Sequence, residues 1–136
     1  MIDKSVSLSD AASLVSVGNT LALGGMTLYR RPLAFTRTLL RENPTARDLT
    51  LLCFTAGIES DMLVGNRRVR SVRSCYFGLE VFGLAPMFTQ AAGDGNIEII
   101  EETEASIAFG IRAALADVGF MPSRAWLGTD LPRLRP

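Results

Sequence analysis

Apolar residues follow two different spacings along this chain, and the two spacings alternate. Short apolar runs without a helical period predict strands at residues 20–23, 48–54, 72–77 and 97–101, with a last extended piece at 124–127. Apolar residues three or four positions apart predict helices over the segments 9–18, 32–42, 59–63, 86–93 and 103–119. Four or five strands that alternate with helices predict an α/β fold with an open, mainly parallel sheet flanked by helices.

Residues at the predicted boundaries support several of these helices. Ser9 is expected to cap the first helix, and Gly18 is expected to end it in a left-handed conformation. Pro32 suits the first turn of the second helix, and Thr103 is a good N-cap for the last and clearest helix. An apolar stripe predicts the buried side of that last helix: Ile107, Ile111, Ala114, Leu115 and Val118.

Length and composition predict a single domain, and the lack of a membrane-spanning or signal-peptide pattern predicts a cytoplasmic protein. Its 136 residues are enough for one domain with a core, and 48% of them are apolar. The 14 basic and 14 acidic residues cancel, so net charge gives no reason to expect nucleic acid or an anionic membrane as a partner. No run approaches the roughly 18 apolar residues of a membrane-spanning helix, and the start has no signal-peptide pattern.

The residue types present limit the available chemistry. The absence of histidine excludes triads that use histidine and most zinc sites, so we expect no metal and assign acid–base chemistry to carboxylates, tyrosines or a partner. Cys53 and Cys75 each lie in an apolar run without a neighbouring ligand. This placement favours buried structural thiols over a disulfide or a nucleophile.

The segment from Asn19 to Pro32 carries the strongest functional signal. Its strand ends at Gly24 and Gly25, and a helix follows within a few residues. Paired glycines at the carboxyl end of a strand let the backbone adopt positive φ and leave N–H groups free to bind negative charge. The ligand crevice of an open α/β sheet lies at these ends. The glycine pair is therefore a candidate anion site, and a tight turn without a ligand is the alternative.

Four arginines cluster around two valines in the middle of the chain: Arg67, Arg68, Arg70 and Arg73. Guanidinium groups suit phosphate, so the cluster is either a phosphate-binding patch or, as its position favours, a solvated or subunit-contact face.

Four glutamates lie along the last strand and the start of the last helix: Glu98, Glu101, Glu102 and Glu104. A glutamate at a helix start is stabilised as the anion by the helix dipole, or has its pKa raised where a ligand site desolvates it. Ordinary helix-start residues are the alternative to an acid–base role. Tyr29 follows the glycine pair and is either a surface tyrosine or part of the same crevice.

Several segments of the sequence resemble one known family. Ser-Asp-Ala-Ala at 9–12, Gly-Asn-Thr-Leu-Ala-Leu-Gly-Gly-Met at 18–26 and Pro-Leu-Ala-Phe-Thr-Arg at 32–37 are similar to the opening of the α (A) subunit of family I CoA transferases. The nearest type is the α (A) subunit of glutaconate CoA-transferase. The similarity continues through residues 48–51, 82–86, 120–125 and 127–131, and so spans essentially the whole chain.

The resemblance implies a CoA-transferase/NagB-like α/β domain that pairs with a β subunit of like fold in a heterodimer or heterotetramer. It implies that acyl-CoA, the substrate, is held at the subunit interface and that the nucleophilic glutamate belongs to the β subunit. The glycine loop, residues 24–26, would supply N–H groups to the thioester oxygen. The residues expected to bind CoA are therefore Gly24, Gly25, Met26, Tyr29, Arg30 and Arg31.

Two alternatives to a transferase remain. A CoA-thioester hydrolase or ring-opening relative would use a glutamate of this chain as acid or base, with Glu104 the first choice and Glu101 the second. A non-catalytic module that binds an anionic metabolite is the other alternative, because the same broad superfamily includes phosphosugar isomerases and regulator effector domains.

The sequence departs from the family in two places. Residues Gly65-Asn66-Arg67 stand where matched subunits often carry a second glycine in a turn. Family α subunits are also about twice as long, so residues 1–136 are expected to be a single α-subunit-type domain that lacks its C-terminal portion and is inactive alone.

Overall fold

The computed structural model describes residues 4–135. The strands are β1 (Thr20–Ala22), β2 (Leu49–Ala56), β3 (Val69–Phe77) and β4 (Glu98–Glu101). The helices are α1 (Leu8–Ser13), α2 (Leu33–Glu42), α3 (Ile58–Gly65), the 3-10 helix η1 (Glu80–Phe82), α4 (Pro86–Gly93), α5 (Glu104–Leu115) and α6 (Leu131–Leu134). None of these helices has the length and apolar character needed to cross a bilayer.

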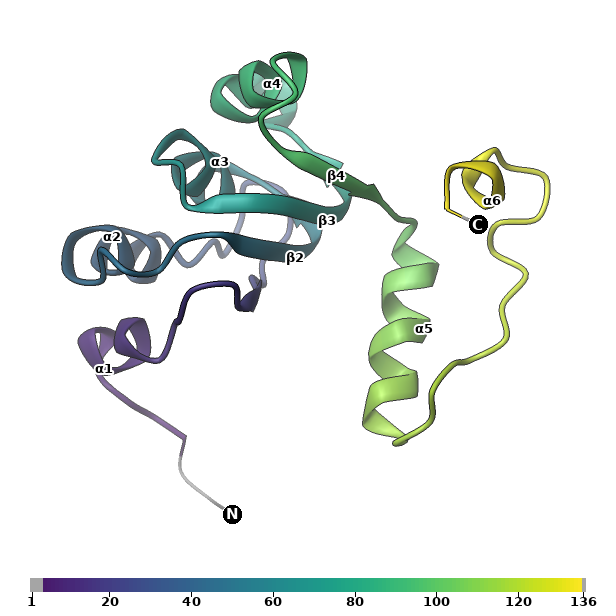
Figure 1. Ribbon diagram of the computed structural model, residues 1–136, viewed down its shortest axis with the longest axis horizontal. Coiled ribbons are helices and arrows are strands. Elements are labelled where there is room, and N and C mark those ends of the chain that lie inside the picture. Colours follow the sequence, from purple (N-terminus) through teal and green to yellow (C-terminus); the bar gives the residue numbers. More distant parts are fainter. Residues whose placement is uncertain (1–3, 136) are drawn as a thin grey trace.

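The four strands form one parallel sheet in the order β1-β2-β3-β4. Successive strands are connected through α2, α3 and α4. Right-handed crossovers between neighbouring strands in this order place their helices on one face of the sheet. Accordingly, α1 to α4 pack beside one another in a single layer (Figure 1). The predicted open α/β fold is confirmed.

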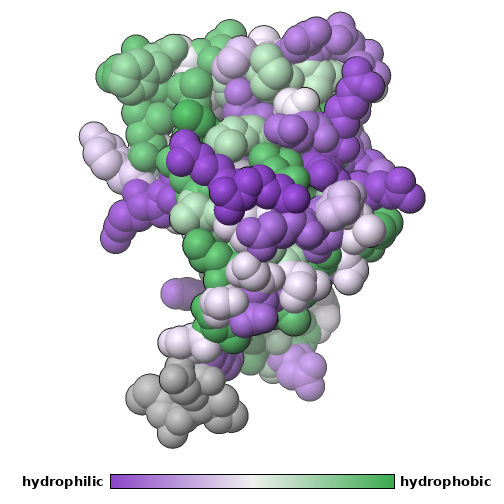
Figure 2. All heavy atoms as spheres, turned by 90° about the vertical axis from the view of Figure 1, so that its left-hand side faces the viewer, coloured by the Kyte–Doolittle hydropathy of each residue, from purple (hydrophilic) through white to green (hydrophobic). Residues whose placement is uncertain are grey.

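The outer side of the helical layer is largely hydrophilic. Figure 2 views the molecule from this side and shows hydrophilic groups across its middle and at its upper right, beside smaller hydrophobic areas. A surface of this mixed kind is ordinary for a layer whose apolar side faces a sheet. This face therefore gives no sign of a binding site among the described residues, and the ends of the strands are the place where open α/β folds bind ligands.

Alternate side chains of β2 fill the space between the sheet and the helical layer. Leu49, Leu51 and Cys53 are at most 2% exposed. They form one apolar cluster with Leu39 of α2 and Leu63 of α3. Complete burial of one leucine contributes about 1.5–3 kcal/mol, so this cluster holds the strands in place and with them the loops at the strand ends.

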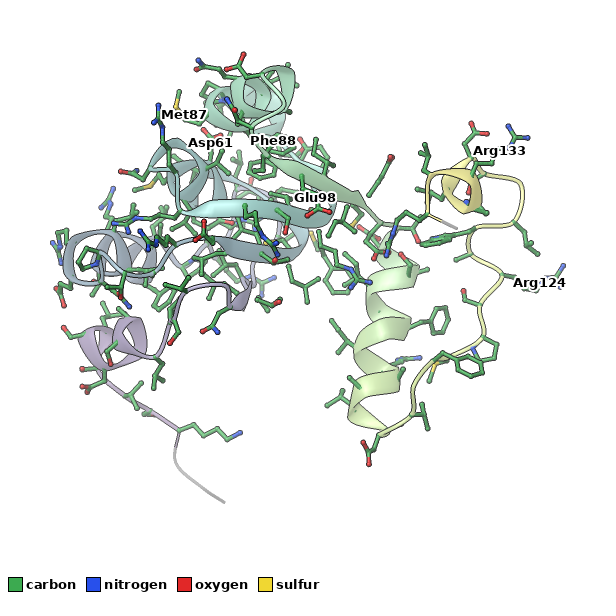
Figure 3. All side chains as sticks on the ribbon, in the orientation of Figure 1. Asp61, Met87, Phe88, Glu98, Arg124 and Arg133 are labelled. Atoms are coloured by element: carbon green, nitrogen blue, oxygen red, sulfur yellow. The ribbon has the colours of Figure 1, made fainter. Side chains whose placement is uncertain are left out.

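A buried carboxylate joins α3 to α4. Asp61 is 7% exposed, and its two oxygens accept the N–H groups of Phe88 at 2.8 Å and of Met87 at 3.4 Å. Figure 3 shows Asp61 close to both residues. The N-cap of α4 is Ala85, whose side chain offers no acceptor, so Asp61 satisfies N–H groups in the first turn that have no partner within the helix. This contact was not predicted, because Asp61 precedes α4 by many positions.

The first helix begins and ends earlier than predicted. Its N-cap is Ser7, and Ser9 lies inside the helix. Ser7 Oγ accepts the N–H of Asp10 at 3.1 Å and donates to the Asp10 carboxylate at 2.6 Å, whereas Ala12, three residues after Ser9, offers no such side chain. Gly18 has the expected positive φ, 75°, but lies in the turn after α1 and does not end the helix.

The apolar stripe of α5 is mostly exposed, contrary to the prediction. Thr103 caps the helix as expected, with Ser106 as the reciprocal partner. Ile107 is 3% exposed, but Leu115 is 83% exposed, and Ala114 also lies on the surface. The physical reason is the direction of α5, which starts where β4 ends and extends away from the layer of α1 to α4 (Figure 1). Regular apolar spacing identified the helix and its start, but the helix ends at Leu115 and not near Gly119, so Val118 lies outside it. The spacing also did not identify the surface against which the helix lies.

The piece predicted as extended at residues 124–127 forms turns instead. The N–H of Leu127 donates to the carbonyl of Arg124, and the N–H of Thr129 donates to the carbonyl of Trp126, each at 3.1 Å. These local hydrogen bonds span three residues, as in turns. The segment therefore adds no strand to the sheet.

Candidate functional site at the carboxyl edge of the sheet

The loops that follow the four strands share one edge of the sheet. Because the strands are parallel, residues 23–32 after β1, Gly57 after β2, residues 78–85 after β3 and residues 102–103 after β4 all emerge there. In open α/β folds this edge holds the ligand. β1 and β4 are the outer strands, so at about 4.8 Å between neighbours their loops start about 14 Å apart.

The backbone at Gly25 admits no side chain. Its φ is +116°, and a Cβ there would lie 2.9 Å from Arg31 Cδ and 3.0 Å from the carbonyl oxygen of Tyr29. Just after it, Met26 and Tyr29 exchange N–H···O=C hydrogen bonds of 3.0 and 2.7 Å, which close a tight turn. At Gly24, by contrast, a Cβ would meet no atom within 4 Å. Glycine is therefore required at position 25 and not at position 24.

Two backbone donors of the glycine loop point to no internal acceptor. The N–H groups of Gly24 and Gly25 form no hydrogen bond within residues 4–135, and both residues are exposed. The N–H of Met26 donates to the carbonyl of Tyr29 and is not an available donor. The sequence left open whether the glycine pair forms a tight turn or presents free N–H groups. The structure has both features: the turn lies at residues 26–29, and the free N–H groups belong to Gly24 and Gly25. The loop offers a ligand two of its three expected N–H groups.

Arg31 is buried and does not face the crevice. Its side chain is 1% exposed and lies 3.3 Å from Glu59 Oε1 in an ion pair whose carboxylate is fully buried. The guanidinium also donates to Thr55 Oγ1 at 2.9 Å, to the carbonyl of Gly24 at 3.5 Å and to the carbonyl of Thr27. The Arg31 guanidinium thus has four partners within the described residues, and the CoA-binding role that the resemblance implied for it stays a prediction.

Tyr29 and Arg30 are placed differently from Arg31. Tyr29 is 71% exposed, and Arg30 is exposed with a φ of 54°. Neither side chain forms a hydrogen bond or ion pair with another described residue. Both remain free to contact a ligand that approaches the glycine loop.

The two glutamates chosen from the sequence are exposed and lie at the far end of the edge. Glu101 ends β4 and Glu104 begins α5, and the carboxylate of neither forms an ion pair within residues 4–135. The glycine loop follows β1, at the other side of the sheet. The chain therefore does not bring Glu101 or Glu104 together with the free N–H groups of Gly24 and Gly25.

Glu102, between them, is the buried member of this glutamate group. It is 4% exposed, and its Oε1 accepts from Arg73 at 2.6 Å and from Arg135 at 2.5 Å. Its Oε2 accepts from the hydroxyl of Ser106. Burial alone raises the pKa of Glu102, but the Ser106, Arg135 and Arg73 hydrogen bonds outweigh it and hold the pKa below the usual value. Glu102 is thus a fixed anion, unsuited to donate a proton.

Glu102 makes stability depend on pH in the acid range. A carboxylate whose pKa is lowered by folding stabilises the protein above the unfolded value, about 4.3 for glutamate, and that contribution is lost as the pH falls through the folded value. We expect the free energy of unfolding to decrease on acidification from about pH 5, and Glu102→Gln to flatten this slope. Urea unfolding at a series of pH values measures it. Glu98→Gln, at an exposed position, is the control, and equal slopes in Glu102→Gln and the native protein would contradict the assignment.

The four arginines noted in the sequence do not form one patch. Arg73 pairs with Glu102, and Arg68 donates to the carbonyls of Pro44 and Ala46. Arg67 and Arg70 are exposed and border a separate surface hollow. The structure thus divides the cluster among three surroundings, which does not favour a shared phosphate site.

A cavity of about 550 Å³ lies between α5 and the segment that follows it. Apolar side chains form most of its wall, including Phe109, Phe120 and Trp126. Glu102 and its partners Arg73, Ser106 and Arg135 also line it. Trp126 Nε1 is buried without a hydrogen-bond partner, and the Arg135 guanidinium lies 5.4 Å from the Trp126 ring. Arg124 and Arg133 point away from the chain in Figure 3 and do not line this cavity.

Both cysteines are free thiols, as expected, but they differ in exposure. Cys53 is buried and Cys75 is half-buried. Burial raises the pKa of both thiols, and nearby carboxylates, Glu59 for Cys53 and Glu104 for Cys75, add to the effect. A raised pKa leaves little of the reactive thiolate at neutral pH.

We therefore expect slow labelling by a thiol reagent such as iodoacetamide at pH 7.5. Cys53 should react only after unfolding in urea, and Cys75 should react more slowly than a small free thiol. Mass spectrometry of the modified peptides distinguishes the two sites, and Cys75→Ser isolates Cys53. Fast modification of Cys53 in the folded protein would show that the core around β2 opens.

The parallel sheet, with exposed backbone donors after β1 and the buried, ion-paired Glu102 after β4, defines an α/β protein with a candidate ligand edge at the strand ends. The family described as Coenzyme A transferase matches residues 6–133. The chain belongs to the coenzyme A transferase family.

Curated relatives include two kinds of protein. The chain is 34% identical over 135 residues to a Rhodococcus jostii protein described as a cholesterol ring-cleaving hydrolase IpdA subunit. It is 33% identical over 132 residues to the α (A) subunit of glutaconate CoA-transferase from Acidaminococcus fermentans. Each match covers 96% of this chain but 44% and 41% of the respective relative, so the chain spans less than half the length of these proteins.

Solved structures agree with the fold. The crystal structure of glutaconate coenzyme A-transferase from Acidaminococcus fermentans is similar with a TM-score of 0.83 and 31% identity, over 94% of this chain and 40% of that one. The decarboxylase AibA/AibB is similar with a TM-score of 0.86 over 96% of this chain and 50% of that one, and at 24% identity it shows likeness of fold alone. The resemblance to the α (A) subunit of glutaconate CoA-transferase is confirmed.

Proposed function

We propose that this chain is the α subunit, or part of the α subunit, of a two-subunit CoA transferase. Such an enzyme moves CoA between an acyl-CoA thioester and a carboxylic acid. On this proposal a β subunit completes the enzyme in the cytoplasm, supplies the nucleophilic glutamate and closes the site, so the chain alone is inactive. Family membership supports the CoA-ester chemistry. The similarity to the α (A) subunit of a glutaconate CoA-transferase supports the choice of a transferase.

One observation carries the proposal: the N–H groups of Gly24 and Gly25, at the carboxyl end of β1, are exposed and form no hydrogen bond with residues 4–135. Attack on a thioester places negative charge on its carbonyl oxygen. Backbone donors already in place stabilise that charge without reorganisation, and loss of one such donor typically costs about 3 kcal/mol of transition-state stabilisation. The exposed Tyr29 and Arg30 would contact the CoA part of the substrate beside these donors.

The bond changes follow from a carboxylate nucleophile. A carboxylate oxygen of the partner bonds to the thioester carbon, and the carbon–sulfur bond breaks to give an anhydride and CoA thiolate. The thiolate then attacks the glutamyl carbonyl, which releases the first acid and leaves glutamyl-CoA. The second acid reverses these steps. The role proposed for Gly24 and Gly25 is to bind the oxygen that carries negative charge in each addition.

A hydrolase or ring-opening enzyme is the second candidate, favoured by the 34% identity to an IpdA subunit. Such a reaction needs an acid or base in place of a partner carboxylate. Glu104 is exposed at the start of α5 and carries no ion pair among the described residues. It remains our first choice for that role and Glu101 the second, because Glu102 is held as an anion by two arginines.

The test is the chain in complex with a CoA-transferase β subunit, supplied with an acyl-CoA and a different carboxylic acid. Chromatography of the CoA esters should show the second acyl-CoA, and the same mixture without this chain is the control. Free CoA released without an acceptor acid, and lost in Glu104→Ala, would instead establish the second candidate. No CoA chemistry, together with thermal stabilisation by sugar phosphates and not by CoA esters, would reject both in favour of a metabolite-binding module.

A further inference from the structure

Two carbonyl groups of the loop after β1 are hydrogen-bonded to the same side chain. Arg31 donates from Nε to the carbonyl of Thr27 and from a terminal nitrogen, 3.5 Å away, to the carbonyl of Gly24. These carbonyls flank the bend at Gly25 and Met26. Arg31 is therefore hydrogen-bonded to the chain on both sides of that bend.

The direction of the Gly24 carbonyl, which faces Arg31 at 3.5 Å, indicates where the N–H of Gly25 points. The carbonyl of Gly24 and the N–H of Gly25 belong to one planar trans peptide, in which the two groups point in opposite directions. Because the carbonyl faces the buried Arg31, the N–H faces away from it, toward the exposed side of the loop. This explains why that N–H has no partner among residues 4–135.

Leu23 anchors the start of the loop in the core, but apolar side chains at the bend itself contribute little. Met26 is 54% exposed and Tyr29 is 71% exposed, so neither side chain anchors it in the core. On its inner side the loop touches Gly57, where a Cβ would lie 2.7 Å from the carbonyl of Thr27. Thr55 Oγ1 adds one contact, accepting the N–H of Thr27 at 3.0 Å. The bend is therefore held by polar contacts: the two backbone hydrogen bonds between Met26 and Tyr29, the one from Thr27 to Thr55, and the two from Arg31. Among the side chains, only Arg31 contacts the chain on both sides of the bend within residues 4–135.

Glu59 in turn fixes Arg31. Its Oε1 accepts from Ser60 Oγ at 2.9 Å and lies 3.3 Å from Arg31, at the first turn of α3. The helix start favours the carboxylate, and the carboxylate is fully buried. Arg31 thus joins three elements: the loop after β1, the end of β2 and the start of α3.

We infer that Arg31, held by Glu59, is a positioning residue that aims the N–H of Gly25 at the thioester oxygen. The inference has two parts. The first, that Arg31 holds the loop in place, does not depend on the proposed function. The second, that the held loop positions the N–H of Gly25 for catalysis, rests on the proposed function. A lysine is a poor replacement, because its ammonium lacks the planar fork that reaches several acceptors at once.

The experiment compares Arg31→Lys, Arg31→Gln and Glu59→Gln with Arg37→Gln, which removes an exposed arginine from α2. Amide hydrogen exchange of the chain, resolved by NMR, measures the loop, and circular dichroism selects the variants that stay folded. In Arg31→Gln and Glu59→Gln we expect exchange at Met26, Thr27 and Tyr29 to rise about tenfold or more, which corresponds to local opening. Arg31→Lys should lie between these variants and the native protein, and Arg37→Gln should change nothing.

The same variants in complex with the β subunit test whether Arg31 positions the N–H of Gly25 for catalysis. A donor displaced by about 1 Å lowers the rate about 100-fold, so we expect kcat to fall by about that factor while KM for acyl-CoA changes little. Unchanged loop exchange in folded Arg31→Gln or Arg31→Lys overturns the holding role. Faster exchange with unchanged kcat overturns the positioning role. A native complex without any CoA chemistry refutes the proposed function, and the exchange data still decide whether Arg31 holds the loop.

Discussion

Replacement of Gly25 by alanine is expected to lower the free energy of unfolding by about 2–4 kcal/mol, as the combined cost of a strained backbone and a steric overlap. The strain arises because φ is +116° there. The overlap arises because the new Cβ would lie 2.9 Å from Arg31 Cδ and 3.0 Å from two carbonyl oxygens. Backbone oxygens cannot give way as a flexible side-chain end can, so the loop must move. Urea unfolding followed by circular dichroism measures the change.

Gly24→Ala is the matched control for stability. Its φ is not in the positive range, and the added Cβ would meet no atom within 4 Å, so the expected change is within about 1 kcal/mol in either direction. A similar loss in both variants would show that the loop conformation around Gly25 differs from the one described. A loss confined to Gly25→Ala would establish that the conformation of the bend requires glycine at position 25, and that flexibility of the glycine pair does not explain the requirement.

Removal of one partner of the Arg31–Glu59 ion pair is expected to cost about 3–5 kcal/mol, because it leaves a buried charge without compensation. Both side chains are at most 1% exposed. Arg31→Met leaves the Glu59 carboxylate alone, and Glu59→Leu leaves the guanidinium with neutral acceptors only. The double variant Arg31→Met/Glu59→Leu removes both charges, so its loss should be clearly smaller than the sum of the two single losses.

Denaturant unfolding of the four proteins measures this coupling directly. The exposed pair Asp130–Arg133, with side chains 84% and 87% exposed, provides the comparison. Its removal should leave the unfolding midpoint unchanged, since solvent screens such pairs. Additive losses for Arg31→Met and Glu59→Leu would contradict the view that the two residues act as one unit.

The order of elements could be predicted from the sequence, whereas the packing of the last helix could not. Residues 49–56 form the expected strand because alternate leucines face the helical layer. In α5 the same kind of regularity misled: Leu115 has the spacing of a buried residue but is 83% exposed. Periodicity reports which side of a helix is apolar, and it does not report what lies against that side.

Within the site, backbone features were easier to predict than side-chain roles. Gly24 and Gly25 were identified correctly as the residues that follow the strand, because paired glycines mark turns and loops. Arg31 was expected to bind CoA because of the family resemblance, whereas its ion pair with Glu59 could not be predicted, since Glu59 is remote in sequence and no local pattern indicates the pair. Likewise, only the fold reveals that Glu102 meets Arg135.

The two outer strands of the sheet differ in how they avoid self-association. An unpaired strand edge can dock onto the edge of another copy and start aggregates. β1 limits this risk by its length of three residues. β4 carries Ile99, 52% exposed, but it begins with Glu98, seen at the sheet in Figure 3, and ends with Glu101. Edge-to-edge pairing of one β4 with another would bring like carboxylates together, so Glu98 and Glu101 oppose such pairing at this edge in a chain of which 48% of the residues are apolar.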